Sequence, residues 1–117
     1  MDIRDLVKAL LSFDALTARQ WVADAYYSGL RWSDITRPAG LNPIEMAVAA
    51  GVVELLAQRS NQDSPVWTGE VPPLEEPVYL VRAALSMPRL RRLCRQEGPE
   101  PLRGRGILAP PEFLTMA

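Results

Sequence analysis

The sequence contains no histidine and a single cysteine, Cys94, among 117 residues. Histidine is the side chain whose proton exchange falls nearest neutral pH, so its absence argues against acid–base catalysis. One cysteine cannot form an internal disulfide, and it leaves no cysteine–histidine cluster for a metal ion. These absences favour a protein that is not an enzyme, and we expect no catalytic residue, no cofactor and no metal site.

Long hydrophobic runs are missing as well. No apolar stretch approaches the roughly 20 residues that a transmembrane helix needs, and the opening segment MDIRDLVKALL carries acids where a signal peptide carries bases. We therefore expect a cytoplasmic protein with no membrane partner. A formal net charge of −1 excludes a globally basic surface of the kind that coats nucleic acids.

The chain is the length of one domain, residues 1–117, and residues 1–60 have the pattern of a three-helix core. The first helix has one apolar stripe from Ile3 to Leu11 with Asp2 as its N-cap. A second helix follows Asp14, its candidate cap, and Gly29 suits its C-terminal end because glycine adopts left-handed backbone without strain.

The third helix opens at Asn42-Pro43-Ile44-Glu45, where a capping side chain, a proline at the first helical position and a glutamate combine. From Ile44 to Ala57 nearly every side of this helix is apolar. Such a helix is buried on all sides, so we expect it at the centre of the fold.

Prolines dominate the second half, which holds nine of the eleven beyond residue 60. Proline breaks regular helix, so we expect a loop over residues 61–76. Two shorter helices should follow within residues 77–98, one from Pro77 to Ser86 and one from Arg89 to Glu97. Residues 99–117 form a C-terminal arm with room for a single helical turn. The predicted fold is all-α, a compact bundle of about five helices with an irregular second half and an extended arm.

Charge is divided unevenly along this second half. Residues 61–80 carry four acids and no base, whereas residues 81–105 carry seven arginines against two glutamates. The basic stretch supplies four candidate phosphate-binding residues, Arg82, Arg89, Arg92 and Arg95. A solvated face that balances the acidic stretch is the simpler interpretation, and we favour it, because no aromatic residue is interleaved to stack on bases.

The arm GRGILAPPEFLTMA, residues 104–117, is too apolar to be an ordinary solvated terminus. It must pack on its own body, on a second copy or on a partner protein, and prolines would lower the entropy lost on docking. Tryptophan and arginine are frequent at interface centres. The candidate partner-binding residues are therefore Trp32, Trp67, Arg103, Arg105, Phe113 and Leu114, with Trp67 serving alternatively as an anchor for its own loop.

Four segments together resemble a group of small prokaryotic helical proteins encoded beside nucleotidyltransferase-like genes, in an arrangement similar to toxin–antitoxin pairs. They are ARQWVADAYYSGLRW, RPAGLNPIEMAVAAGVVELLAQR, PVWT and APPEFL, and the likeness spans Ala15 to Leu114. The resemblance implies an antitoxin-like subunit that covers a nucleotidyltransferase-type toxin, and it carries over no functional residues. From the apolar arm and the missing catalytic residues we add the hypothesis that Arg103 and Arg105 reach the acidic active site of that partner. Two alternatives stay open, a nucleic-acid-binding module that uses the arginine cluster 82–95 and a structural homodimer.

Overall fold

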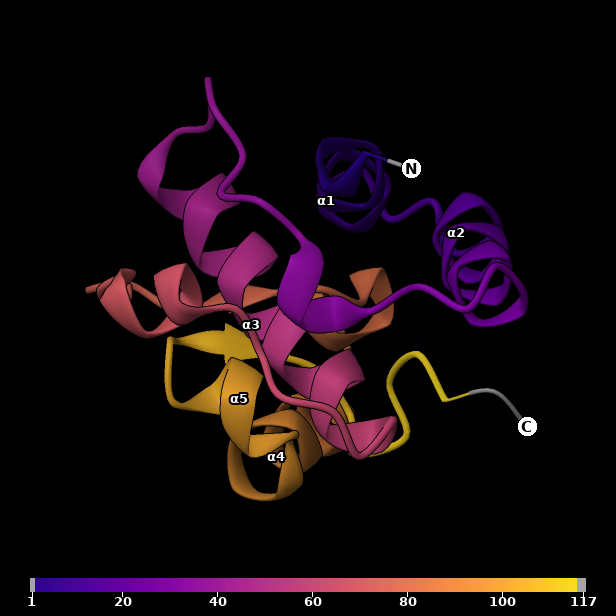
Figure 1. Cartoon of the computed structure of the whole chain (residues 1–117). Helices are drawn as coiled ribbons and strands as arrows, with labels where there is room; N and C mark the ends of the chain where they lie inside the picture. Colours follow the sequence, from indigo (N-terminus) through magenta and orange to yellow (C-terminus); the bar gives the residue numbers. More distant parts are fainter. Residues whose placement is uncertain (1, 116–117) are drawn as a thin grey trace.

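Helix α3 (Pro43–Arg59) runs through the middle of the molecule, as its apolar sequence predicts (Figure 1). Within residues 47–57 every residue is buried except Glu54, which is half-buried. Its neighbours are α1, η1, η2, α5 and β2, which are placed around it. The central position follows from the lack of a polar side, because each face needs an apolar neighbour.

The computed structural model describes residues 2–115, and in this range the fold is all-α in character with two very short strands. Helices α1, α2 and α3 make up the first half. The elements and their bounds are α1 (Ile3–Leu11), α2 (Ala15–Tyr27), the 3-10 helix η1 (Trp32–Asp34), α3 (Pro43–Arg59), η2 (Val66–Glu70), β1 (Val78–Tyr79), η3 (Arg82–Leu85), α4 (Pro88–Glu97), α5 (Glu100–Arg103) and β2 (Ile107–Leu108).

The three long helices begin at the predicted caps. The side chain of Asp2 accepts from the backbone of Arg4, and that of Asp14 accepts from the backbone of Thr17 at 3.1 Å. At α3 the capping box is complete. The Asn42 side chain accepts from the Glu45 N–H at 2.8 Å, and the Glu45 carboxylate accepts from the Asn42 N–H at 3.0 Å.

All three long helices end in the same way, with a residue in left-handed backbone two positions after the last helical residue. Gly29 (φ 69°) follows α2 and Asn61 (φ 53°) follows α3, and both residue types suit this conformation. Phe13 (φ 60°) follows α1. Each end carries the 6→1 backbone bond of a Schellman motif, Asp14 N to Ala9 O at 2.8 Å, Leu30 N to Ala25 O at 3.2 Å, and Gln62 N to Ala57 O at 2.9 Å.

The predicted helix from Pro77 to Ser86 is wrong. Val78 and Tyr79 form β1, which pairs in parallel with β2 in the register Val78 to Ile107 and Tyr79 to Leu108. Only the later residues coil, in η3. The chain exchanges helical bonds for bonds to the C-terminal segment, because Leu80 N donates to Leu108 O at 2.9 Å. Helix α4 does form where expected, with Pro88 as its first residue.

The C-terminal arm packs on its own chain. Residues 107–110 are buried beside α3, and Ile107 and Ala109 have no exposed surface. The single turn expected in the arm is α5, which also packs on α3. Residues 111–115 continue along the surface toward α2, and the last two residues of the arm lie outside the described range.

Candidate interaction site

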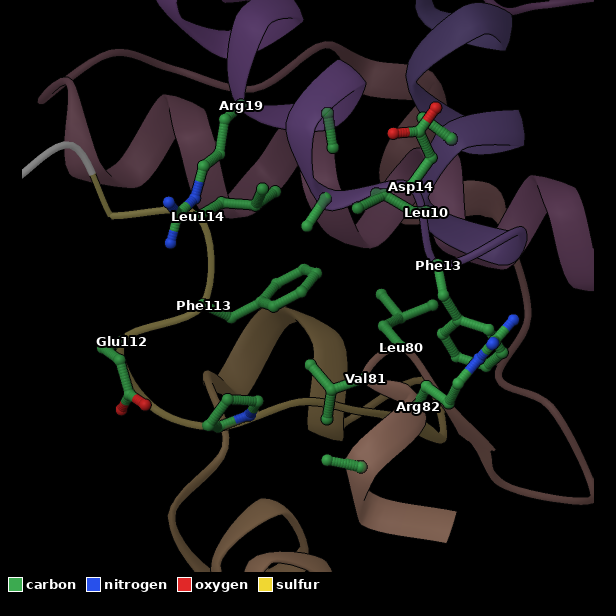
Figure 2. Close-up of a pocket in the computed structure, with 15 residues that line it drawn as sticks. Leu10, Phe13, Asp14, Arg19, Leu80, Val81, Arg82, Glu112, Phe113 and Leu114 are labelled. Atoms are coloured by element: carbon green, nitrogen blue, oxygen red, sulfur yellow. The ribbon is translucent and has the colours of Figure 1, made fainter.

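A pocket of about 350 Å³ opens where the corner between α1 and α2 faces the end of the arm. One wall is the α1–α2 corner, the second is the segment from Leu80 to Ala83, and the third is the arm from Pro110 to Leu114 (Figure 2). Phe113 and Leu80 point toward one another across the opening. The volume lies within the range of small-ligand and side-chain pockets.

The corner wall owes its shape to Phe13. Helix α1 ends at Leu11, and the left-handed backbone of Phe13 turns the chain so that Asp14 can cap α2. The phenyl ring lies below the guanidinium of Arg82, whose Cζ is 5.3 Å from the ring centroid. This cation–π contact joins the corner to the Leu80–Ala83 wall.

The arm wall is held by Arg59, in the last turn of α3. Its guanidinium donates to the carbonyl of Phe113 and, at 3.2 Å, to the carbonyl of Pro111. Burial lowers the pKa of Arg59, which still remains charged at neutral pH. Because the clamp acts on backbone oxygens, it fixes the path of the arm and leaves the Phe113 ring free to line the pocket.

Leu114 also lines the pocket and also has left-handed backbone, with φ 58°. Among the described residues, the non-glycine positions with positive φ are Phe13, Asn61 and Leu114. Asparagine tolerates this conformation through its short polar side chain, whereas phenylalanine and leucine are strained there. Both strained residues therefore face one pocket, and strain of this kind is commonly kept at functional sites.

The pocket interior is mainly apolar, and four charged residues line it: Asp14, Arg19, Arg82 and Glu112. Hydrogen bonding to Thr17 lowers the pKa of Asp14, so this carboxylate is committed to capping α2. Among residues 2–115 neither Arg19 nor Arg82 forms an ion pair. The site can thus receive an apolar group, and the charged groups at its edge that lack an ion pair among residues 2–115 are Arg19, Arg82 and Glu112.

Three of the sequence-predicted site residues meet here, namely Arg82, Phe113 and Leu114. The corner residues Phe13 and Arg19 were missed. The sequence does contain a signal for Phe13. In SFDA a large apolar residue stands between the end of one helix and the N-cap of the next.

Trp32 and Trp67 do not offer the predicted partner contacts, because both are built into the fold. Trp32 is 2% exposed, and its indole N–H donates to the Ser60 hydroxyl at 3.2 Å. Trp67 is 9% exposed and donates to the carbonyl of Ile35 at 2.8 Å. Trp67 therefore anchors its own loop, which was the alternative left open by the sequence.

Arg103 and Arg105 are likewise engaged within the chain. Arg103 pairs with Glu100 at 2.8 Å. Arg105 forms a bidentate ion pair with Glu54, with N···O distances of 2.5 and 3.1 Å, and also donates to the Thr68 carbonyl. Arg105 is therefore not available to a partner in the way the prediction requires, whereas the pair made by Arg103 lies at the surface and leaves that side chain 37% exposed. The other three candidate phosphate-binding residues, Arg89, Arg92 and Arg95, are exposed on α4.

Comparison with known proteins adds no relative from which a role could be transferred: no family model, no curated protein and no solved structure matches the chain. Within the described residues no helix has the combined length and apolarity that crossing a membrane requires.

Burial raises the pKa of the Cys94 thiol, which is fully enclosed beside Ala84 and Leu108.

Proposed function

We propose that this chain is a non-enzymatic interaction subunit that receives an apolar side chain of a partner protein in the pocket between Phe13 and Leu114. The observation that carries the proposal is the meeting of both strained apolar residues in one apolar pocket. A buried aromatic or branched anchor in such a pocket is the usual centre of a protein interface.

The partner segment should carry a carboxylate next to its apolar anchor. Arg19 and Arg82 lie at the pocket without an ion-pair partner among the described residues, and guanidinium groups bind carboxylates through two parallel hydrogen bonds. The resemblance described above supplies the class of partner, a nucleotidyltransferase-type toxin that this chain would neutralise as an antitoxin-like subunit.

The test is co-expression of the product of the adjacent gene with this chain, followed by co-purification and growth measurement. Ala83→Trp fills the pocket from an exposed position on η3, so we expect it to reduce affinity at least tenfold and to abolish growth rescue. Ala39→Trp makes the same change on an exposed loop away from the pocket and should leave both readouts intact.

Failure of the unmodified chain to co-purify or to restore growth would exclude the proposed partner. Equal affinity of the Ala83→Trp and Ala39→Trp variants would exclude the pocket as the binding site. Circular dichroism of each variant shows whether the fold is kept, so that loss of binding is not mistaken for loss of structure.

A further inference from the structure

Helix α4 lies at the periphery of the molecule and packs principally on η3 (Figure 1). Its inner side contributes Leu90 and the buried Cys94 to a small apolar cluster with Ala84 and Leu108. Arg89, Arg92 and Arg95 are exposed and recur every three residues. At a rise of about 1.5 Å per residue, the row extends about 9 Å along the helix.

Within residues 2–115 the three guanidiniums of this row have no carboxylate partner. The ion pairs of the described residues involve Arg4, Arg37, Arg103 and Arg105 only. The acidic stretch 61–80 does not neutralise the row, because the ion pair formed in that stretch joins Glu70 to Arg37. The arginine face is solvated, as the sequence predicts, and among residues 2–115 no direct ion pair joins it to the acidic stretch.

Neighbouring groups position the helix through Arg91 and orient one member of the row, Arg95. Arg91 donates to the carbonyls of Ala84 and Leu85 at 3.1 and 2.8 Å, which fixes the start of α4 against η3. Arg95 Nε donates to the Tyr79 hydroxyl at 2.6 Å, and its guanidinium lies 5.9 Å from the ring centroid. Arg95 is thus oriented by an aromatic ring while its terminal nitrogens remain open to a ligand.

We propose that Arg89, Arg92 and Arg95 on the exposed side of α4 bind the phosphates of double-stranded DNA along the major groove. The planar guanidinium matches phosphate in a bidentate manner. A peripheral helix fits the B-DNA major groove, which is about 12 Å wide, whereas the deep major groove of duplex RNA is too narrow for side chains to enter. Arg82 does not belong to this surface, because it lies over Phe13.

Fluorescence anisotropy with a labelled DNA duplex of about 20 base pairs, titrated with the full chain between about 25 and 200 mM salt, tests the proposal. Three phosphate contacts give an expected slope of log K against log salt of about −2.7. Arg89→Gln with Arg92→Gln should make the slope shallower by about 1.8. The matched control is Lys8→Gln with Arg31→Gln, which removes the same charge from two exposed positions that also lack an ion pair among residues 2–115, and it should keep the slope.

Three results would overturn the proposal: no anisotropy change at the lowest salt, an equal loss in both double variants, or equal affinity for an RNA duplex of the same length. Binding to an acidic peptide of matched charge but not to DNA would assign the surface to a protein partner instead. The Ala83→Trp variant separates this surface from the pocket, because it should leave the DNA affinity unchanged.

Discussion

Phe13 and Leu114 both have strained left-handed backbone, and this backbone places their side chains at the pocket. Left-handed backbone costs an ordinary side chain about 1–2 kcal/mol, and the equivalent position after α2 is occupied by Gly29. The difference lies in what the side chain meets. A Cβ at Gly29 would have nothing within 4 Å, whereas the Phe13 ring contacts Arg82 and lines the pocket.

Replacing Phe13 with glycine should leave the free energy of unfolding within about 1 kcal/mol of the parent. Relief of about 1–2 kcal/mol of strain offsets the lost ring packing and a cation–π contact of about 0.5–1 kcal/mol. Gly29→Phe, the reciprocal change, should cost about 1–2 kcal/mol without compensation. Urea denaturation measures both, and a loss above about 3 kcal/mol for Phe13→Gly would identify the ring as an essential core residue.

Arg105 stabilises the junction of α3, η2 and α5 through Glu54 and the carbonyls of Thr68 and Pro101. Arg105→Met should lower the free energy of unfolding by about 3 kcal/mol, because a partly buried carboxylate and two carbonyls lose their partner. Adding Glu54→Leu should recover most of the loss, since an apolar pair replaces the ion pair. Chemical denaturation of the single and double variants decides between these outcomes, and a double variant as unstable as the single one would contradict the argument.

The stability of the N-terminus of α1 should depend on pH through the N-cap Asp2. Hydrogen bonding from the Arg4 side chain lowers the pKa of Asp2 from 3.8 to about 2. Its stabilising contribution is therefore complete above pH 3.8 and is lost as the pH falls toward 2. The carboxylate is exposed, so the effect should stay below about 1 kcal/mol and shrink with salt. Comparing Asp2→Asn with the parent by thermal unfolding from pH 5 downward should show the two curves converging at low pH.

At the scale of elements, the boundaries that depend on neighbouring residues in the sequence were predictable. The caps at Asp2, Asp14 and Asn42 were all expected, because a side chain that bonds to backbone three residues or fewer away needs no tertiary context. The segment Pro77–Ser86 failed for the opposite reason. Its apolar residues have helical spacing, but Val78 and Tyr79 instead pair with a strand almost thirty residues later in the chain. No local sequence pattern predicts that pairing.

Gly98 allows α4 to end against the arm, and its substitution tests the contact between these elements. A Cβ at Gly98 would lie 2.5 Å from the Cys94 carbonyl oxygen and 2.7 Å from that of Ala109. Gly98→Ala should therefore destabilise the protein by about 2–3 kcal/mol, since backbone must move. Gly69→Ala, where nothing lies within 4 Å, should be nearly neutral, and equal denaturation midpoints for the two variants would contradict the packing.

At the scale of the whole molecule, the sequence predicted the class and the central helix but left the arm undecided. Apolar content shows that a segment must be buried, but it carries no information about which surface buries it. The structure places Ile107 and Ala109 beside α3 and leaves Phe113 and Leu114 at the pocket. The burial of Trp32 could not be predicted for the same reason, because its hydrogen-bond partners Ser60 and Gln62 lie 28 and 30 residues further along the chain.

Two truncations should separate the structural part of the arm from the part that forms the pocket. A chain that stops at Arg103 lacks the partner of β1 and exposes α3, so we expect no cooperative unfolding transition. A chain that stops at Pro110 keeps those contacts and loses only the Arg59 clamp and the pocket wall, at a cost of about 1–3 kcal/mol. Far-UV circular dichroism with urea titration distinguishes the two, and a native-like transition for the shorter chain would refute this division.

The pairing of β1 with β2 also sets an order on events during synthesis. Protein chains are made from the N-terminus at about 5–20 residues per second, and early segments ordinarily begin to fold while later ones are still being added. Here the apolar side of α3 that packs against residues 102–109 is synthesised more than forty residues before those residues are. The nascent chain must therefore wait for several seconds with its future core open, and this is the interval in which a chaperone or a bound partner would have the greatest effect on its yield.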